Sequence, residues 1–600
     1  MIVDYLILTF SNWLVLKFFF TLRYMRKLIF FCVAQVVFCS TQAQTTTTVF
    51  EQSAGTKTPT YFEIIDWWKK LDAASPKVKM FTKGNTDANL PLHLVIISNN
   101  GVFDIAKLKQ ANKRIVFVNN GIHPGEPDGI DASMLLARDI VANKYKLPDN
   151  IVLALIPVYN IGGSLNRSEY YRIDQEGPEA FGSRGNPQNL DLNRDFIKSD
   201  SREARSFAQI FHELDPDVFV DNHVSNGADY QHVITLLSTQ HNKLGGEMGM
   251  YLQNEFEPAL YALMQEKGFD LIPYVNHWSN RKVEEGWKGF WDSPRYSTGY
   301  AGLWHTFSFM PETHMLKPYK QRVEATYALM QSFIAFTSGN SEKIKTLRAN
   351  AKQQIKTQQV FPIQFEHDTT VVKTITFKGF ESGNKPSGVS GLSRLYYDRT
   401  KPFTKQIPFY NQFKQTRTIE KASAYIIPQG WWKVIELLQL NKVVMYQLKS
   451  DTVITVDVYR IEKYNSQATA YEAHHVNTNT EVSTTSKAMP FRKGDWYIPL
   501  NQVANRFLIE TLEPTAEDSY FAWNFFDGIL GQKEGYAAYV FEDKAAVMLQ
   551  ENAALRKALQ DKQQADSQFA KSARAQLDFV FKQSPYYEPD HLRYPVYRVK

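Results

Sequence analysis

The chain has 600 residues, about four times the ~150 residues of a typical domain, so more than one globular unit is expected. Hydrophobic residues make up 44% and charged residues 22% of the sequence, which excludes a collagen-like or disordered protein. The net charge of +6 comes without a basic stripe interleaved with aromatic residues, so nucleic acid and anionic membrane surfaces are not expected as partners. The only cysteines are Cys32 and Cys39, so a metal bound after residue 39 must be held by histidine and carboxylate side chains.

Residues 1–43 have the pattern of a secretory signal peptide. Basic residues up to Lys27 precede an apolar run of about twelve residues at 28–39, and small and polar residues follow as far as Ala43. The pattern predicts a true start at Met25, cleavage near Ala43, and a secreted or periplasmic mature protein without stable membrane insertion. Membrane anchoring by residues 2–20 is the less favoured alternative. Removal of residues 1–43 would lower the net charge from +6 to +3, because they hold four basic residues and one acid.

Strand and helix patterns alternate between residues 92 and 336. Strands are predicted at 92–97, 114–119 and 151–157, with a helix at 130–141 between the last two. A strand, a helix and a strand within about 40 residues indicate a β-α-β unit of a largely parallel sheet. The further expected elements are a helix at 201–214, strands at 218–220 and 233–237, a helix at 246–267, a strand at 303–310 and a helix at 319–336.

The character of the sequence changes in its last third. The helical pattern fades after residues 338–340, and from about residue 360 segments such as 369–377 and 452–461 alternate like half-exposed strands. A helix is expected at 431–440 and a helical tail at 543–581. We therefore expect a catalytic unit over residues 50–345 and a strand-rich accessory domain with a C-terminal helix over residues 360–600.

A candidate metal site begins at His123 and Glu126, in the sequence His-Pro-Gly-Glu. The two residues come after a predicted strand and before a predicted helix, which is where open α/β sheets bind ligands. Gly121 and Gly125 would allow the chain to turn sharply there.

His223 is the candidate for a third ligand, because it directly follows another short buried strand. The alternative is a histidine that bonds only to the backbone at a strand end. Two histidines and one glutamate would leave the fourth position of a zinc ion open for water, the arrangement of a catalytic rather than a structural site. We expect one Zn²⁺ per catalytic domain.

A hydrolytic zinc site also needs a general base, and Glu312 lies at the end of the last apolar strand of this unit, where it reaches the same sheet edge. The loop at 160–195 is rich in arginine, a side chain suited to bind carboxylates and to stabilise negative charge. Its arginines are Arg167, Arg172, Arg184 and Arg194.

Together, these residues and their neighbours resemble the zinc carboxypeptidases of the carboxypeptidase A type. The resemblance rests on five separated motifs in the same order: His-Pro-Gly-Glu, Asn-Ile-Gly-Gly at 160–163, Leu-Asp-Leu-Asn-Arg-Asp-Phe at 190–196, Asp-Asn-His at 221–223, and Glu312. It covers roughly residues 50–345. It implies an α/β fold with a mixed, largely parallel sheet and helices on both faces.

The resemblance also implies roles for individual residues. His123, Glu126 and His223 would bind zinc, and Glu312 would be the general base that activates the zinc-bound water. Asp191 would orient His123 from behind.

The remaining implied roles concern the substrate. Asn193 and Arg194 would bind the C-terminal carboxylate, and Arg172 would stabilise the oxyanion of the tetrahedral intermediate, with Arg167 as the competing assignment. Tyr296, rather than Tyr300, would match the mobile tyrosine of the family. The implied function is a zinc-dependent metallocarboxypeptidase that hydrolyses the C-terminal bond of peptide substrates.

Two alternatives stay open. The family's usual Asn-Pro-Asp-Gly is replaced by Asn-Ile-Gly-Gly at 160–163, and Thr-His-Met follows Glu312 in place of the usual residues. One alternative is therefore an amidase or peptidase of the same fold that acts on cell-wall peptides or acylated amino acids. The other is an inactive, peptidase-like binding protein. The oligomeric state is left open.

Overall fold

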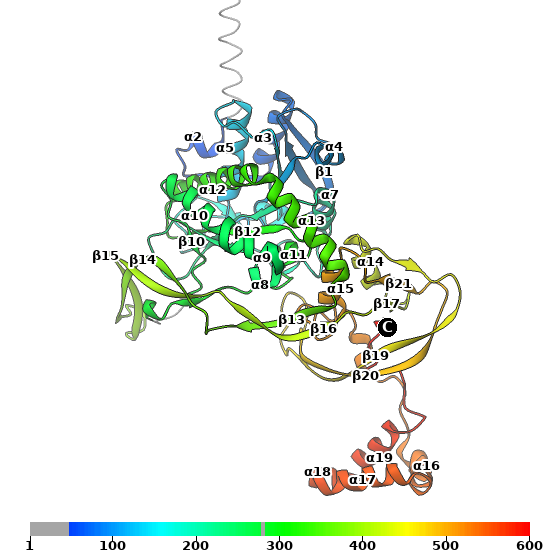
Figure 1. Cartoon of the computed structure of the whole chain (residues 1–600). Coiled ribbons are helices and arrows are strands. Elements are labelled where there is room, and N and C mark those ends of the chain that lie inside the picture. Colours follow the sequence, from blue (N-terminus) through cyan, green and yellow to red (C-terminus); the bar gives the residue numbers. More distant parts are fainter. Residues whose placement is uncertain (1–46, 278–281) are drawn as a thin grey trace, which may run out of the picture.

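The computed structural model describes residues 47–277 and 282–600 (Figure 1). The predicted signal peptide, its start at Met25 and the alternative anchor at residues 2–20 lie outside these described residues. Within the two described ranges, no helix is both long and apolar enough to cross a membrane.

A mixed, mostly parallel β-sheet forms the centre of the N-terminal region. Its strand order is β1-β2-β4-β3-β7-β12-β9-β10, and β8 pairs with β12. The strands are β1 Val78–Asn85, β2 Pro91–Ile97, β3 Arg114–Asn119, β4 Ile151–Ile156, β7 Val218–Asp221, β8 His223–Ser225, β9 Ile234–Ser238, β10 Ile272–Pro273 and β12 Phe307–His314. Because β4, β3, β7 and β12 are parallel neighbours, their carboxyl ends meet at one edge of the sheet.

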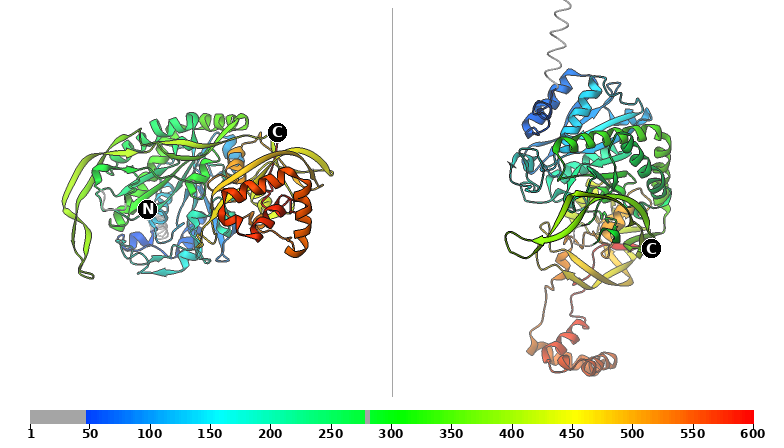
Figure 2. Two further views of the ribbon diagram at one scale, coloured as in Figure 1. Left: turned by 90° about the horizontal axis from the view of Figure 1, so that it is seen from below. Right: turned by 90° about the vertical axis from the view of Figure 1, so that its left-hand side faces the viewer.

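Helices cover both faces of this sheet, as expected for the fold class (Figures 1 and 2). Successive side chains of a strand point to opposite faces, so Val116 and Val118 pack in one core and Ile115 and Phe117 in the other. The first face is covered by α3 Tyr61–Ala74, α5 Asp128–Val141, α9 Gly246–Tyr251, α10 Glu257–Glu266, α12 Tyr319–Gly339 and α13 Ser341–Thr357. The second is covered by α4 Ile105–Gln110, α7 Arg202–Leu214 and α11 Ser297–Gly302. The predicted β-α-β unit is confirmed, because α5 joins the parallel strands β3 and β4.

Short helices and strands complete this region. They are α2 Val49–Gln52, α6 Ile161–Leu165, α8 His241–Leu244 and the two-residue strands β5 Arg167–Ser168 and β6 Phe181–Gly182, which pair with each other. Helix α3 and strand β1 precede the first strand that the sequence pattern predicted.

Two predicted boundaries are wrong. The last strand of the sheet begins at Phe307 rather than at residue 303, because the chain first completes α11 and turns through His305, whose φ is +57°. The helical pattern does not end near residue 340 either. The chain breaks at Asn340 and starts again as α13, which buries Ile344 and Leu347 at helical spacing.

The C-terminal region is rich in antiparallel strands, as predicted. A long hairpin of β14 Lys373–Pro386 and β15 Ser393–Tyr410 pairs with β11 Trp287–Lys288, and β13 Val360–His367 pairs with β16 Phe413–Glu420. A further sheet contains β17 Ala424–Ile427, β18 Tyr446–Gln447, β19 Thr452–Ser466, β20 Asn477–Phe491, β21 Trp496–Pro499 and β22 Tyr597–Val599. Helices α14 Trp432–Leu440 and α15 Asn505–Leu512 pack beside it.

The predicted helical tail consists of four helices with a small core of their own. They are α16 Ala538–Glu551, α17 Ala553–Ala565, α18 Ser567–Ala570 and α19 Ala573–Lys582. Figures 1 and 2 show them projecting from the rest of the molecule. The chain then returns, and β22 pairs with β17 and β19.

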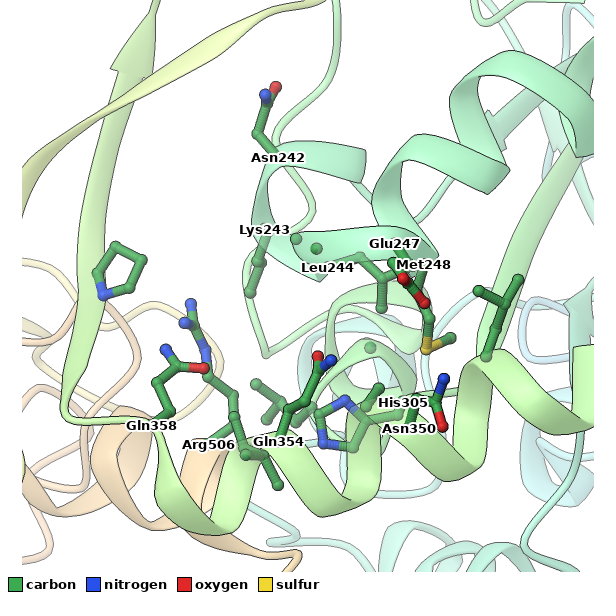
Figure 3. Close-up of a pocket in the computed structure, with 18 of the residues that line it drawn as sticks. Asn242, Lys243, Leu244, Glu247, Met248, His305, Asn350, Gln354, Gln358 and Arg506 are labelled. Atoms are coloured by element: carbon green, nitrogen blue, oxygen red, sulfur yellow. The ribbon is translucent and has the colours of Figure 1, made fainter.

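One hydrophobic core continues from the N-terminal sheet into the C-terminal region. Phe207 and Trp304 belong to the same buried cluster as Phe507 and Trp523, and the rings of Trp304 and Phe507 lie 5.2 Å apart. The seam between the two regions also holds a cavity of about 410 Å³. Figure 3 shows His305 at this cavity, together with Gln354 of α13 and Arg506 of α15. The two regions are therefore joined by extensive apolar packing.

Candidate metal centre and active site

His123 and Glu126 lie in the loop between β3 and α5, at the carboxyl edge of the sheet. The loop is tightly wound: the backbone N–H of Glu126 donates to the carbonyl of His123 at 2.8 Å, and Gly121 has a φ of +66°. Both side chains are buried, with 2% and 3% of their surface exposed.

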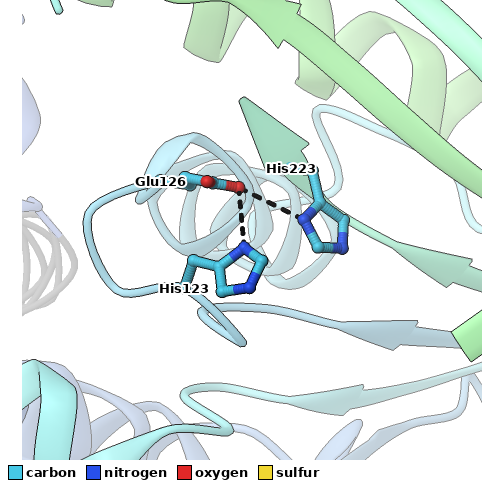
Figure 4. Close-up of side chains that lie close together, drawn as sticks. All are labelled: His123, Glu126 and His223. Carbon is cyan, nitrogen blue, oxygen red and sulfur yellow. Dashed lines mark hydrogen bonds and ion pairs between the residues drawn. The ribbon is translucent and has the colours of Figure 1, made fainter. Parts of the chain in front are cut away.

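His223 begins β8, which directly follows β7, and it too is buried. Strand β3 pairs with β7, so the loop after β3 and the start of β8 lie side by side. The sheet therefore brings together His123, Glu126 and His223, as Figure 4 shows.

Each histidine is oriented by a carboxylate. Nε2 of His123 lies 2.9 Å from Oδ1 of Asp191, and Nε2 of His223 lies 2.9 Å from Oδ2 of Asp221. The two Nδ1 atoms therefore face inward, 3.3 and 3.2 Å from Oε2 of Glu126. Such a carboxylate behind the ring fixes the tautomer and direction of a metal-binding histidine.

The three residues fit a divalent metal ion. Their nearest ligand atoms all lie within 4.8 Å of one another, and Nδ1 of His123 is buried without a hydrogen-bond partner among the described residues. A buried polar atom without a partner is unfavourable unless an ion or another group satisfies it. Two imidazole nitrogens and a carboxylate form a ligand set suited to zinc, and they leave positions open for water and substrate.

The charges in this cluster are strongly coupled. Burial alone would raise the pKa of Glu126, but His123 and Arg172 hold it well below its usual value. Burial likewise opposes protonation of His223, yet Asp221 and Glu126 raise the pKa of that imidazole well above its usual value. A bound cation would take the place of this positive charge on His223.

Glu312 lies on β12, directly beside His223 in the parallel register of β12 and β8. Burial raises the pKa of Glu312 to about 8, Glu126 adds to this effect, and His223 opposes it. The structure thus places a carboxyl group next to the candidate metal centre, on the strand where the sequence pattern located it.

Two arginines reach the centre. Arg172 donates through Nη1 to Oε1 of Glu126 at 2.6 Å and through Nη2 to the carbonyl of Val224 at 2.9 Å. Arg184 donates through Nε to Oδ2 of Asp191 at 3.0 Å, and its Nη1 lies 3.4 Å from Oε1 of Glu126. The side chain of Arg184 is 49% exposed, so it has room to contact a substrate. The sequence pattern listed Arg184 among the loop arginines but assigned it no role.

Arg167, the competing assignment for Arg172, points elsewhere. Its guanidinium donates to the backbone carbonyls of Thr58, Pro59 and Ala180. It therefore holds the loop against the N-terminal segment and does not reach the candidate metal centre.

A cavity of about 330 Å³ opens beside the centre. Its lining includes His123, Glu126, Arg172 and Arg184. Near it, Ile173 is 93% exposed and offers an apolar contact surface. A cavity with convergent polar groups beside an apolar contact is suited to bind a ligand.

Asn193 and Arg194 follow Asp191 in one short turn. The buried Asn193 accepts the N–H of Ser297 at 3.2 Å, which ties this turn to the start of α11. The guanidinium of Arg194 lies 4.6 Å from the centre of the Tyr296 ring. Tyr300 instead is 1% exposed and donates its hydroxyl to Asn441, so of the two tyrosines only Tyr296 lies at Arg194.

The sequence of the chain is similar to known proteins. Residues 64–236 match the family model of the zinc carboxypeptidases. The expected resemblance is confirmed. The matched segment holds His123, Glu126, His223 and the loop arginines, whereas Tyr296 and Glu312 lie beyond its end.

Curated relatives extend over more of the chain. Carboxypeptidase 2 of Trichophyton equinum is 18% identical over 489 residues, which cover 78% of this chain and 84% of that protein. Carboxypeptidase 2 of Trichophyton rubrum is 17% identical over 426 residues, which cover 68% and 73%.

The chain also has a low similarity to solved structures. Carboxypeptidase A from Helicoverpa armigera is 15% identical with a TM-score of 0.37, and the match covers 48% of this chain and 75% of that one. A metallo-carboxypeptidase from Burkholderia cenocepacia is 15% identical with a TM-score of 0.36, and the match covers 46% and 70%.

Proposed function

We propose that this protein is a zinc-dependent metallocarboxypeptidase that releases the C-terminal residue of peptides. The observation that carries the proposal is the convergence of two carboxylate-oriented histidines on Glu126, with a buried Nδ1 of His123 that lies 3.3 Å from Glu126 and makes no hydrogen bond among the described residues. The zinc carboxypeptidase match at residues 64–236 supports it.

His123, Glu126 and His223 would hold the zinc ion. When bound there, zinc supplies a Lewis acid that polarises a carbonyl and lowers the pKa of water. Asp191 and Asp221 keep both imidazole rings aimed at this position through their hydrogen bonds to Nε2.

Glu312 is our candidate for the general base. Its position beside His223 would let the carboxylate take a proton from the attacking water and return it to the leaving amine. Arg172 lines the cavity beside His123 and Glu126 and is our candidate for stabilising the negative charge that develops on the carbonyl oxygen. Arg184 offers further N–H donors, since its Nη1 approaches the same oxygen of Glu126 as Arg172 does.

Arg194 and Asn193 are our candidates for binding the terminal carboxylate of the substrate. The planar fork of arginine matches a carboxylate, and the Tyr296 ring, 4.6 Å from the guanidinium, helps to hold it in place. We assign the catalytic unit to residues 50–345 and the accessory unit to residues 360–600, and we propose that a signal peptide at residues 1–43 directs the protein out of the cytoplasm.

Metal content and substrate preference test the proposed function together. We expect about one zinc per chain, release of the last amino acid from peptides with a free C-terminus, loss of activity with a chelator, and recovery with zinc. His223→Ala should lose metal and activity, whereas His475→Ala, at an exposed position, should keep both.

Three outcomes would contradict the proposal. Absence of both zinc and hydrolysis would favour a binding protein. Cleavage confined to cell-wall peptides or acylated amino acids would favour the amidase alternative. Retained zinc in the His223→Ala variant would contradict the ligand assignment.

A further inference from the structure

A tight turn of the C-terminal region lies against the segment that carries Arg194. The turn consists of Tyr471–His474 and lies between β19 and β20. Arg194 donates its Nε–H to the hydroxyl of Tyr471 at 3.0 Å, and the backbone N–H of Asp191 donates to Oε2 of Glu472 at 2.8 Å. Nε2 of His474 lies 2.8 Å from Oδ2 of Asp200. Three residues of one turn thus contact segment 191–200, which precedes it by more than 270 residues.

The backbone of this turn is strained. Its central residues, Glu472 and Ala473, have φ values of +49° and +64°, and backbone hydrogen bonds close the turn between Tyr471 and His474 in both directions. Two successive residues with positive φ favour asparagine and glycine, which are absent here. Such strain persists where the surrounding contacts over-determine the conformation, and it clusters at functional sites.

The ring of Tyr471 is held rigidly. It stacks on Trp523 at 6.2 Å with an angle of 24° between the planes, and the guanidinium of Arg295 lies 5.9 Å from its centre. Arg295 is itself fixed by Asp518, which accepts its backbone N–H at 2.8 Å and its Nε–H at 2.9 Å. The C-terminal region therefore anchors both Tyr471 and the residue before Tyr296.

These contacts leave the Nη2 side of Arg194 for a ligand. Its Nε–H is taken by Tyr471, and Nη1 donates to the carbonyl of Asn193 at 2.9 Å and lies 3.8 Å from Oδ2 of Asp191. The Tyr296 ring lies 4.6 Å from the guanidinium, and the side chain is 21% exposed. A carboxylate bound in bidentate fashion at the Nη1–Nη2 edge would share Nη1 with Asn193 and Asp191, and the guanidinium is held in one orientation before a substrate arrives.

We propose that Tyr471 is a positioning residue for Arg194, and that the turn Tyr471–His474 completes the subsite for the terminal carboxylate of the substrate from the C-terminal region. The inference rests on the proposed function, because it assumes that Arg194 binds that carboxylate. It gives the accessory region a direct part in substrate recognition and restricts good substrates to those with a free terminal carboxylate.

Tyr471→Phe is the sharpest test, since it removes one hydroxyl and keeps the ring on Trp523. In the zinc-loaded full-length protein, we expect KM for a peptide with a free C-terminus to rise about tenfold while kcat stays within twofold. The preference for the free acid over the matched C-terminal amide should fall by the same factor. The thermal midpoint should stay close to that of the unmodified protein.

Tyr464→Phe is the matched control, because Tyr464 is a half-buried tyrosine of β19 whose ring packs on Phe521 at 6.0 Å. We expect its KM and its acid-over-amide preference to be unchanged. Ala473→Gly should also keep KM, since glycine adopts positive φ readily and keeps the turn.

The outcomes separate the two proposals. If the unmodified protein cleaves free C-termini and Tyr471→Phe leaves KM and the acid-over-amide preference unchanged, the inference is overturned and the proposed function stands. If the zinc-loaded unmodified protein hydrolyses no peptide with a free C-terminus, both are overturned.

Discussion

Oδ2 of Asp221 lies 2.9 Å from Nε2 of His223, two residues further along the chain. Asp221 is fully buried at the end of β7, and its other oxygen accepts the side-chain amide of Asn119 at 2.9 Å. One carboxylate thus ties the end of β3 to the imidazole ring and directs Nδ1 of His223 toward Glu126.

This relationship predicts the effect of Asp221→Asn. The substitution removes the negative charge behind His223 and places an amide where two donors need acceptors, so zinc affinity should fall about 10- to 100-fold. Competition with a chromogenic chelator measures the affinity. Asp66→Asn, at an exposed position of α3, should leave it unchanged. Equal affinities for the Asp221→Asn variant and the unmodified protein would show that this carboxylate does not support the metal centre.

Glu312→Gln separates metal binding from catalysis. Glutamine keeps the size of the side chain but cannot take the proton of the attacking water, so kcat should fall about 10²- to 10⁴-fold. Zinc content should stay at the level of the unmodified protein, because Glu312 is not among the three converging residues. Turnover close to that of the unmodified protein would require a different general base.

The loop arginines should divide into two classes. Arg172 and Arg184 line the cavity at the metal centre, so alanine at either position should lower kcat by about a hundredfold. Arg167→Ala should instead lower the thermal midpoint, because Arg167 satisfies three backbone carbonyls away from the centre. Thermal melts and steady-state kinetics on the three variants distinguish these effects. A loss of kcat for Arg167→Ala at unchanged stability would reverse the assignment.

Local sequence patterns were sufficient to predict which site residues lie at the ends of neighbouring strands. His123, His223 and Glu312 each lie at or near the carboxyl end of a strand of one parallel set, and strand order brings such positions together. The β-α-β pattern therefore predicted their common edge, and the family resemblance implied the helices on both faces.

Contacts between segments far apart in the chain could not be predicted from local sequence patterns. The turn Tyr471–His474 meets Asp191 and Arg194 only because the C-terminal region shares a core with the N-terminal sheet. The hydrophobic periodicity of either segment does not predict the contact between them. Tyr296 and Tyr300 have the same local character, and only packing decides that Tyr300 is buried against Asn441. The sequence pattern predicts the end of the helical region near residue 340, whereas the chain only breaks at Asn340 between two helices. Small and polar residues are typical of both a helix end and a domain boundary, so the pattern does not distinguish them.

His305, at the seam between the two regions, should lower the stability of the folded protein in acid. Burial, together with the charges of Lys352 and Arg348, lowers the pKa of this imidazole to about 3. Below about pH 6.5 the unfolded chain binds a proton that the folded protein does not, so stability falls as the pH drops toward 3. The contribution is about 2 kcal/mol between pH 7.5 and pH 5.

His305→Asn removes this titration and suits the positive φ at the position, because asparagine adopts that conformation readily. The free energy of unfolding, measured in urea at both pH values, should therefore fall less on acidification in this variant than in the unmodified protein. His475→Asn, at an exposed histidine, should show the same decrease as the unmodified protein. An equal decrease in the His305→Asn variant would mean that other buried histidines, such as His232 and His241, account for the acid sensitivity.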